Sequence, residues 1–425
     1  MSNLKSVAQT WTKKSIDELT AGEHGIDSQT MAIAKEIVDD VHNNGTSAVR
    51  RISENFGDIS ADAPLILEHH QLQTALSSID SATRELLERT ATRIRTFAEA
   101  QRNSLADCSI DIPGGTAAHR WVPLQIAGCY APGGRYPLPS SVLMTAVTAR
   151  VAGVQQVWVA SPKPTVETIA AAAIAGADGL LCVGGAQAIG AFAYGLKGVV
   201  SPVDVIVGPG NRFVSAAKAI VSRTTRIDML AGPSEIVVVA SSDAHAPLVA
   251  ADLLAQAEHD TDARPILISD DESFAIKVQQ EIAAQLETLP TAIVARAALQ
   301  NGGYLVVESV AAAIEACRQI APEHLSLQGE KVASAADQFT CGSALFIGNG
   351  SAEVIGDYGA GPNHVLPTGG RARSESGLSV ATFIRMQTQL HITDTNKATP
   401  LIEDAVKLAR IEGLEAHARS AALRI

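Results

Sequence analysis

The sequence predicts an α/β protein with two related parallel-sheet domains and helical extensions at its N- and C-terminal ends. Hydrophobic residues make up 46% of the 425 residues and aromatic residues only 4%. Small apolar side chains in this proportion suit helices packed on both faces of a sheet. From residue 125 onward, strand-like runs alternate with helical runs in two series. Such alternation is typical of parallel strands joined by helices.

The first quarter of the chain is predicted to be mainly helical. Apolar residues recur at helical spacing within 17–45, and the run Asn43-Asn44-Gly45 breaks that pattern. A further helix is predicted over 80–103. Residues 110–113 and 121–124 are expected to be short extended pieces, because their prolines suit the edges or ends of sheets.

Each of the two later series contains four predicted strands. The strands of the first series cover 126–130, 157–161, 179–183 and 203–207. Those of the second series cover 235–240, 265–269, 304–308 and 344–347. Helices of the second series are expected over 246–258, 273–286 and 310–320.

The two series suggest a division of the chain into two sheet domains. We expect a discontinuous first domain over 25–127 and 235–376, and a second domain over 128–234. An N-terminal tail would cover 1–24 and a helical tail 377–425. Thr399 is a suitable N-cap for the tail's last helical part, with Pro400 at the first position.

Composition narrows the functional classes. The formal net charge is -12, which argues against a general nucleic-acid binder or a protein of anionic membranes. The N-terminus has no apolar signal core, and no apolar run is long enough for a bilayer. The five cysteines form no C-x-x-C pair, so we expect reduced, mostly buried thiols in a cytoplasmic protein.

Glycine turns follow several predicted strands. The run Gly208-Pro-Gly-Asn-Arg-Phe213 is similar to a dinucleotide fingerprint but lacks its third glycine, and Gly184-Gly185 also fails the spacing. Tight turns between strands and helices need glycine in any case. The turns alone therefore do not establish a nucleotide site.

Glu323 and His324 place a carboxylate beside an imidazole. Either group can give or take a proton near neutral pH if its surroundings tune it. They follow Pro322, a residue that suits the first turn of a helix. The ordinary interpretation is a polar helix start, and the functional one is an acid–base pair.

Metal-ligand candidates are scattered along the chain. Gln256 and His259 are three residues apart on a predicted helix and would project from one face. Asp357 lies in a glycine-rich loop and His417 near the C-terminus. Taken singly, each has an ordinary role as a turn, helix-end or tail residue. Ser234, which follows Gly232-Pro233, could bind a ligand or simply satisfy its turn.

Long motifs together carry a family resemblance that no single turn carries. They are Gly128–Gly134, Pro139–Met144, Val183–Ile189, Val207–Asn211, Ala231–Glu235, Asp252–His259, Ala321–His324 and Gly361–Pro367. In this order they resemble the histidinol dehydrogenase family. The resemblance implies incomplete Rossmann-like domains. It also implies a zinc- and NAD-dependent enzyme of histidine biosynthesis that oxidises L-histidinol to L-histidine through an aldehyde.

The same resemblance assigns roles to residues position by position. It implies the zinc ligands Gln256, His259, Asp357 and His417, and the catalytic pair Glu323 and His324. It implies substrate contacts from Ser234, His364 and Glu412 together with the zinc ligands and His324. It implies NAD contacts from Tyr130, Gln187 and Asn211. It further implies a homodimer with shared active sites, in which the tail helps to complete the neighbour's site.

Two alternatives stay open at this level. Gly134-Arg135-Tyr136 is also similar to a run in relatives that oxidise other small polar alcohols, such as a sulfopropanediol dehydrogenase. Substrate choice depends on a few pocket contacts. The second alternative, from another class, is a non-catalytic zinc-stabilised binding protein.

Overall fold

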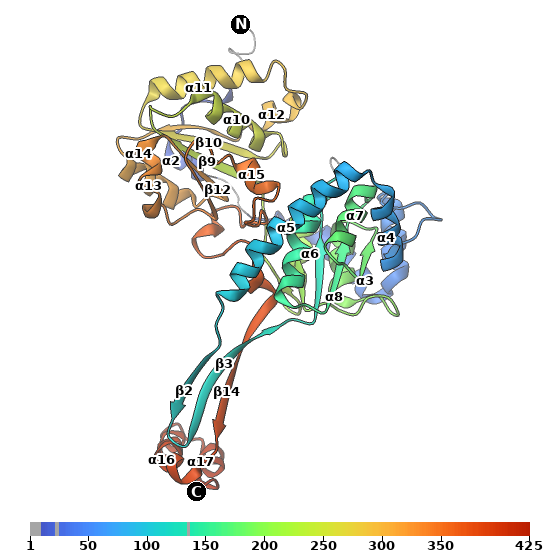
Figure 1. Ribbon diagram of the computed structural model, residues 1–425, viewed down its shortest axis with the longest axis vertical. Helices are drawn as coiled ribbons and strands as arrows, with labels where there is room; N and C mark the ends of the chain where they lie inside the picture. The colour runs from blue at the N-terminus through green and yellow to red at the C-terminus, as the bar shows by residue number, and fades with distance from the viewer. Residues whose placement is uncertain (1–9, 22–24, 134–136) are drawn as a thin grey trace.

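The computed structural model describes residues 10–21, 25–133 and 137–425. Figure 1 shows two α/β bodies beside each other and a long arm that projects from them and carries the C-terminus. The run Gly134-Arg135-Tyr136 lies outside the described residues. No helix in the described part of the chain is both long enough and apolar enough to cross a membrane.

The first body is built on a six-stranded sheet with the order β1-β6-β5-β4-β7-β8. Its strands are β1 (Ile66–Glu68), β4 (Ile126–Tyr130), β5 (Gln156–Ala160), β6 (Gly179–Leu181), β7 (Val205–Val207) and β8 (Arg226–Ile227). All neighbours are parallel except β1, which pairs antiparallel with β6 at one edge. The predicted parallel series is therefore confirmed, with an antiparallel edge strand that the sequence pattern did not reveal.

Helices from residues 28–103 and from residues 139–221 cover this sheet. They are α3 (Ser28–Asn55), α4 (His69–Ser78), α5 (Ser81–Asn103), α6 (Pro139–Ala152), α7 (Val166–Ile174), α8 (Gly185–Tyr194) and α9 (Arg212–Val221). One apolar core contains Val38 of α3 and Ile94 of α5 together with Val159 of β5. The expectation that 25–127 joins 235–376 is therefore wrong for α3–α5, which bury their apolar faces against 128–234.

The second body is a five-stranded, all-parallel sheet with the order β11-β10-β9-β12-β13. Its strands are β9 (Glu235–Ala240), β10 (Arg264–Ser269), β11 (Gly303–Val306), β12 (His324–Gln328) and β13 (Ala344–Ile347). Its helices are α10 (Ala246–Ala257), α11 (Glu272–Gln285), α12 (Ala292–Ala298), α13 (Val310–Ile320), α14 (Glu330–Ala333) and α15 (Glu353–Asp357).

Residues 10–21, the described part of the expected N-terminal tail, belong to the second body. The indole of Trp11 is fully buried and donates to the Pro265 carbonyl at 3.0 Å. Helix α2 (Ile16–Thr20) buries Leu19 in the apolar core that also contains Val237 and Leu325. The expected N-terminal tail thus packs on the five-stranded sheet in its described part.

The arm is a three-stranded antiparallel sheet with the order β14-β3-β2. The central strand β3 (Gly115–Pro123) pairs with β2 (Cys108–Ile112) on one side and with β14 (Ile384–Ile392) on the other. Helices α16 (Thr395–Ile411) and α17 (Glu415–Ala422) follow β14. Figure 1 shows both helices at the far end of the arm. The tail is helical as expected, but α16 begins earlier, capped by Asp394, so Pro400 lies inside it.

Candidate active site

The acid–imidazole pair lies at the amino-terminal edge of the five-stranded parallel sheet. His324 is the first residue of β12, which runs between β9 and β13. Ser234 immediately precedes β9, and His324 stands in register with Ile236 of that strand. The expectation of a helix start after Pro322 is therefore wrong. The preceding helix α13 ends at Ala321 in a left-handed conformation with φ 47°, and Pro322 leads into a strand.

Glu323 is held by two hydrogen bonds from the start of β9. Its Oε2 accepts from the Ser234 hydroxyl at 2.5 Å and from the Glu235 backbone N–H at 2.9 Å. The residue is 6% exposed. Burial raises the pKa of its carboxyl well above the usual range, although the two hydrogen bonds act in the opposite direction. Ser234 thus fixes the acid in one orientation, which accounts for a serine at this turn.

His324 has one nitrogen anchored and one free. Its Nδ1 lies 3.1 Å from the Glu235 carbonyl oxygen. A carbonyl only accepts, so Nδ1 carries the proton and Nε2 keeps its lone pair. Nε2 is buried and has no hydrogen-bond partner among the described residues. Burial lowers the pKa of this imidazole. The free Nε2 therefore suits a base.

Three of the four proposed metal ligands lie close to this pair. Gln256 occupies the last turn of α10, and His259 follows just beyond the helix end. Asp357 ends α15, and its Oδ2 lies 3.8 Å from His259 Nε2. The Gln256 side chain is fully buried, yet neither its oxygen nor its nitrogen has a partner in the described part of the chain. Buried amides are normally satisfied. The orphaned amide of Gln256, with the imidazole of His259 and the carboxylate of Asp357, is a set of groups that fits a divalent cation such as zinc.

His364 connects this site to the first body. Its Nδ1 lies 2.9 Å from the Asp357 carbonyl oxygen, and its Nε2 lies 3.3 Å from the Ser141 hydroxyl in the first turn of α6. The neighbouring Asn363 donates to the Met144 carbonyl of the same helix at 2.8 Å. The loop that carries His364 therefore bridges the two bodies beside the metal-ligand candidates.

Two predicted site residues lie elsewhere in this chain. Glu412 is the C-cap of α16, and His417 lies within α17. Figure 1 places these helices at the tip of the arm, well away from the body that contains α10 and α15. A single chain therefore does not bring His417 to Gln256, His259 and Asp357.

The three residues implied for NAD lie at the carboxyl edge of the six-stranded sheet. Tyr130 ends β4, and its hydroxyl accepts from the Gly185 N–H at 3.3 Å. Gln187 lies in the first turn of α8, and Asn211 follows β7 and caps α9 with two hydrogen bonds. The strand order reverses around β4, and ligands of open α/β sheets bind at such switch points.

The structure adds residues that the sequence did not single out. Asp58 Oδ2 accepts from the Gly184 N–H at 3.0 Å and from Gln187 Nε2 at 3.1 Å. Glu353, the first residue of α15, is 1% exposed, and its Oε1 lies 3.7 Å from His324 Nε2. Burial, followed by the neighbouring Asp357, raises the pKa of Glu353 to about 9. The only sequence signal for Glu353 is a carboxylate one helical turn before Asp357.

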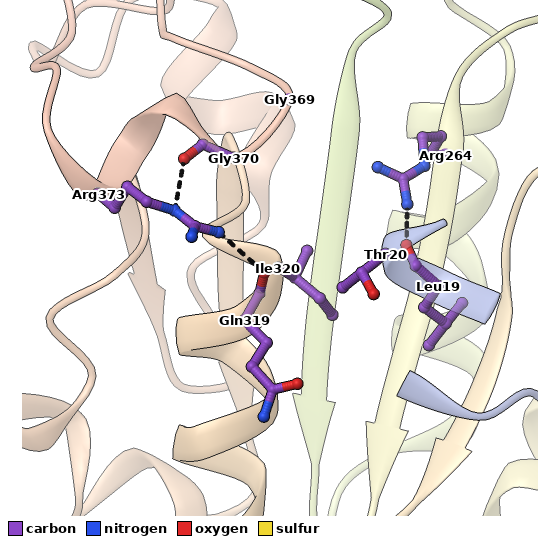
Figure 2. Close-up of a pocket in the computed structure, with 8 residues that line it drawn as sticks. All are labelled: Leu19, Thr20, Arg264, Gln319, Ile320, Gly369, Gly370 and Arg373. Atoms are coloured by element: carbon purple, nitrogen blue, oxygen red, sulfur yellow. Dashed lines mark hydrogen bonds between the residues drawn. The ribbon is translucent and has the colours of Figure 1, made fainter. Parts of the chain in front are cut away.

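A cavity of about 290 Å³ is lined by residues of α2, β10, α13 and the loop 369–373. None of the predicted site residues lines it. Figure 2 shows that two arginines reach it from different elements. Arg264 pairs with Glu235 at 2.7 Å, and Arg373 donates to the carbonyls of Gly370 and Gln319, each at 2.9 Å. Because both guanidinium groups already make bonds within the protein, we interpret this cavity as a packing gap behind the site and not as a ligand site.

A buried carboxylate beside an imidazole in an α/β fold, next to candidate ligands for a cation, is an arrangement typical of an enzyme. A family model for histidinol dehydrogenase matches residues 22–425. The histidinol dehydrogenase of Haloarcula marismortui is 43% identical over 392 residues, 91% of each chain. That of Nitrosomonas europaea is 40% identical over 416 residues, 96% of each chain. The solved histidinol dehydrogenase of Elizabethkingia anophelis superposes with a TM-score of 0.87 at 30% identity, covering 99% of this chain and 96% of the other.

The chain therefore belongs to the histidinol dehydrogenase family, and it is an oxidoreductase. These matches confirm the resemblance and the fold class inferred from the sequence. They favour neither the dehydrogenase of another small alcohol nor the non-catalytic binding protein.

Proposed function

We propose that the protein catalyses the NAD-dependent, four-electron oxidation of L-histidinol to L-histidine through L-histidinaldehyde. The observation that carries this proposal is the buried pair Glu323 and His324, together with the buried, unpaired amide of Gln256 and the ion pair of the more exposed His259 with Asp357. Their side chains present unpaired polar atoms, among them both polar atoms of Gln256 and Nε2 of His324. A polar, cation-bound substrate would satisfy atoms that the chain itself leaves without partners.

Zinc would be held by Gln256, His259 and Asp357, and when bound it would fix the amino and imidazole nitrogens of the substrate. His417 of the partner subunit would complete the set. The hydride acceptor, NAD, would lie along Tyr130, Gln187 and Asn211 at the switch point of the neighbouring sheet. The bridge from His364 to Ser141 spans the space between these two groups of residues.

In the first half-reaction, His324 acts as the base. Its Nε2 takes the hydroxyl proton while the carbinol C–H bond breaks and its electron pair leaves as hydride. The Glu235 carbonyl holds the Nδ1 proton, so it fixes the tautomer and stabilises the imidazolium that forms. Burial keeps the resting imidazole neutral and ready to accept a proton.

In the second half-reaction, Glu323 activates water. The carboxylate removes a proton as the water oxygen attacks the aldehyde carbon, and the resulting hydrate loses its C–H hydride with His324 again as base. Ser234 and the Glu235 N–H both donate to Oε2 of Glu323, so Oε1 faces the water. The proposed further substrate contacts are His364 of the same chain and Glu412 of the partner subunit.

The proposed assembly is a homodimer in which the arms are exchanged. His417 and Glu412 lie far from the rest of the site within one chain (Figure 1). The arm and its helices also expose large apolar side chains, among them Leu390 at 70%, Ile411 at 81% and Leu423 at 85%. A neighbouring subunit would cover this surface while receiving the two residues.

The decisive experiment is NADH formation with L-histidinol, measured on the purified protein before and after chelation. We expect two NADH per histidinol, loss of activity on chelation, and recovery with zinc. Sulfopropanediol serves as the comparison substrate. A protein that reduces NAD with sulfopropanediol and not with histidinol, or that turns over neither, contradicts the proposal.

A further inference from the structure

The loop that follows α3 brings a carboxylate to the residues proposed for NAD. Asp58 lies three residues beyond the end of that helix, where its backbone N–H donates to the Ser53 carbonyl at 2.7 Å. Its Oδ2 accepts from the Gly184 N–H at 3.0 Å and from Nε2 of Gln187 at 3.1 Å. A residue from the first quarter of the chain therefore holds the start of α8, which follows β6 at the carboxyl edge of the six-stranded sheet.

The bond to Asp58 decides which way the Gln187 amide faces. A carboxylate oxygen only accepts, so the amide must present its N–H group to Asp58 and turn its oxygen away. That oxygen, Oε1, is buried and has no hydrogen-bond partner among the described residues. Gln187 as a whole is only 1% exposed. Because buried amide oxygens are normally paired, Oε1 is an acceptor that a ligand can fill.

This open acceptor lies at the turn that begins α8, close to Tyr130. A Cβ on Gly185 would approach Oε1 of Gln187 to 2.8 Å, so the lack of a side chain at this glycine leaves room beside the oxygen. The N–H of Gly185 donates to the Tyr130 hydroxyl at 3.3 Å. Burial raises the pKa of Tyr130 to about 12, and the nearby charge of Asp58 acts in the same direction. Asp58, Gln187 and Tyr130 therefore form one polar cluster around the turn.

We propose that Asp58 is a positioning residue of the NAD site, which orients the Gln187 amide so that Oε1 accepts a hydrogen bond from the bound cofactor. The matching group on NAD is an N–H or O–H donor, either the carboxamide of the nicotinamide or a ribose hydroxyl, since a phosphate oxygen cannot pair with an acceptor. Asp58 acts through Gln187. This inference rests on the proposed function, in which Gln187 contacts NAD, and adds the residue that sets the direction of that contact.

The test measures NAD affinity by calorimetry on the full-length protein supplied with zinc, together with KM for NAD and for histidinol. Asp58→Ala removes the acceptor, so the amide can rotate and Oε1 loses its fixed direction. We expect Kd and KM for NAD to rise about tenfold, with KM for histidinol within about twofold of wild type. Wild-type affinity for NAD in Asp58→Ala overturns the proposal.

A conservative variant separates orientation from charge. Asp58→Asn keeps one oxygen that can still accept from Gly184 and Gln187. It should therefore bind NAD within about threefold of wild type, although it lacks the negative charge. A loss of affinity in Asp58→Asn equal to that in Asp58→Ala overturns the proposal, because charge and not the direction of the amide would then explain both.

A double variant shows whether Asp58 acts through Gln187. Gln187→Ala alone should lower NAD affinity about as much as Asp58→Ala. In the Gln187→Ala background, the further change Asp58→Ala should cost no more than about twofold, because the effects of residues in one hydrogen-bond network do not add independently. Losses that multiply in the double variant overturn the proposal, since Asp58 would then act independently of the amide.

Asp204 offers a matched control on the same sheet. Its Oδ2 also accepts two hydrogen bonds, from the N–H groups of Gln125 at 2.7 Å and Ile126 at 3.0 Å, but at the amino end of β4. Asp204→Ala should lower the urea midpoint and leave Kd for NAD within about twofold of wild type. Equal losses of NAD affinity in Asp204→Ala and Asp58→Ala overturn the proposal, because general destabilisation then accounts for them.

A cofactor analogue identifies the donor on NAD. In 3-acetylpyridine adenine dinucleotide a methyl group replaces the NH₂ of the carboxamide. If that NH₂ is the donor, Asp58→Ala should change affinity for the analogue by no more than about twofold, and if a ribose hydroxyl is the donor, by about tenfold. A wild-type protein that binds no NAD would instead contradict the proposed function itself, and this inference with it.

Discussion

At the scale of single residues, the pair Glu323–His324 could be found from the sequence, but its setting could not. Pro322 favours a helix start by its residue type, whereas in the structure it follows the left-handed end of α13 at Ala321. Proline is common just after a helix end because it cannot continue the helix. The following strand, β12, is hydrogen-bonded on both sides, to β9 and to β13. Pairing of this kind depends on distant segments, so no local sequence pattern reveals it. Glu353 was missed for a similar reason, since a lone acid carries no mark of burial.

The division of labour proposed for Glu323 and His324 predicts different losses in two variants. Glu323→Gln should slow oxidation of histidinaldehyde more than oxidation of histidinol, because only the second half-reaction needs activated water. His324→Asn should slow both, by about a hundredfold or more. Stopped-flow NADH formation with each substrate measures the two steps. Equal losses at both steps in Glu323→Gln would contradict the assignment.

The pH dependence follows from the buried imidazole. A base must be neutral to act, and burial lowers the pKa of His324 from its ordinary 6.5. The neutral form therefore persists below pH 6.5, and the acid limb of kcat/KM for histidinol should fall below that value. A bound cation nearby acts in the same direction. Rates from pH 5 to 9 check this, and an acid limb centred above pH 7 would count against His324 as the base.

At the scale of elements, most strands and helices followed from periodicity and turn residues. The predicted break at Gly45 appears as a non-helical residue, φ 54°, inside α3. Strands β4, β9 and β13 match their predicted bounds. The pairing of β14 with β3 spans most of the chain. Only the folded sheet brings those two segments together, so spacing could not predict it.

One buried ion pair supports the Gly208 turn, which precedes Asn211, one of the residues proposed to contact NAD. Lys218 of α9 and Asp228 form an ion pair, and both side chains are almost fully buried. The ammonium donates to the Gly208 carbonyl at 2.9 Å, and Asp228 accepts from the Gly208 N–H at 2.7 Å. A Cβ on Gly208 would approach the Tyr130 carbonyl oxygen to 1.9 Å. The pair therefore fixes a turn that only glycine fits.

Removing the lysine should damage both stability and nucleotide binding. Lys218→Met leaves the Asp228 charge buried and uncompensated, which costs about 3–5 kcal/mol. We expect a lower urea midpoint and a raised KM for NAD, with a smaller change in KM for histidinol. The exposed Lys197→Met is the matched control. A Lys218→Met protein with the wild-type midpoint and KM for NAD would contradict this role.

At the scale of the whole molecule, the family and the two-sheet plan could be inferred from the sequence, but the packing of α3–α5 could not. Apolar periodicity shows that a helix has a buried face, and it does not show which sheet covers that face. The amino edge of one sheet carries the acid–base pair, and the carboxyl edge of the other carries the proposed nucleotide residues. The position of His417 at the end of the arm follows only from the folded chain.

The proposed exchange of arms predicts complementation between two inactive variants. One carries His324→Asn in its body and the other His417→Asn in its arm. When the two are unfolded together and refolded, about half of the dimers should be mixed, and each mixed dimer should contain one intact site. We expect about a quarter of wild-type activity from the mixture and almost none from either variant alone. An inactive mixture that contains mixed dimers would show that each chain completes its own site.

The long arm also makes the specific activity depend on the concentration of the protein. In the proposed homodimer the imidazole of α17 acts in another copy, so an isolated chain would be inactive even when it is fully folded. Specific activity should therefore drop on dilution through the range where copies separate, and return on concentrating. In a cell that has just begun to make this polypeptide, histidine synthesis would lag behind translation until enough chains had met.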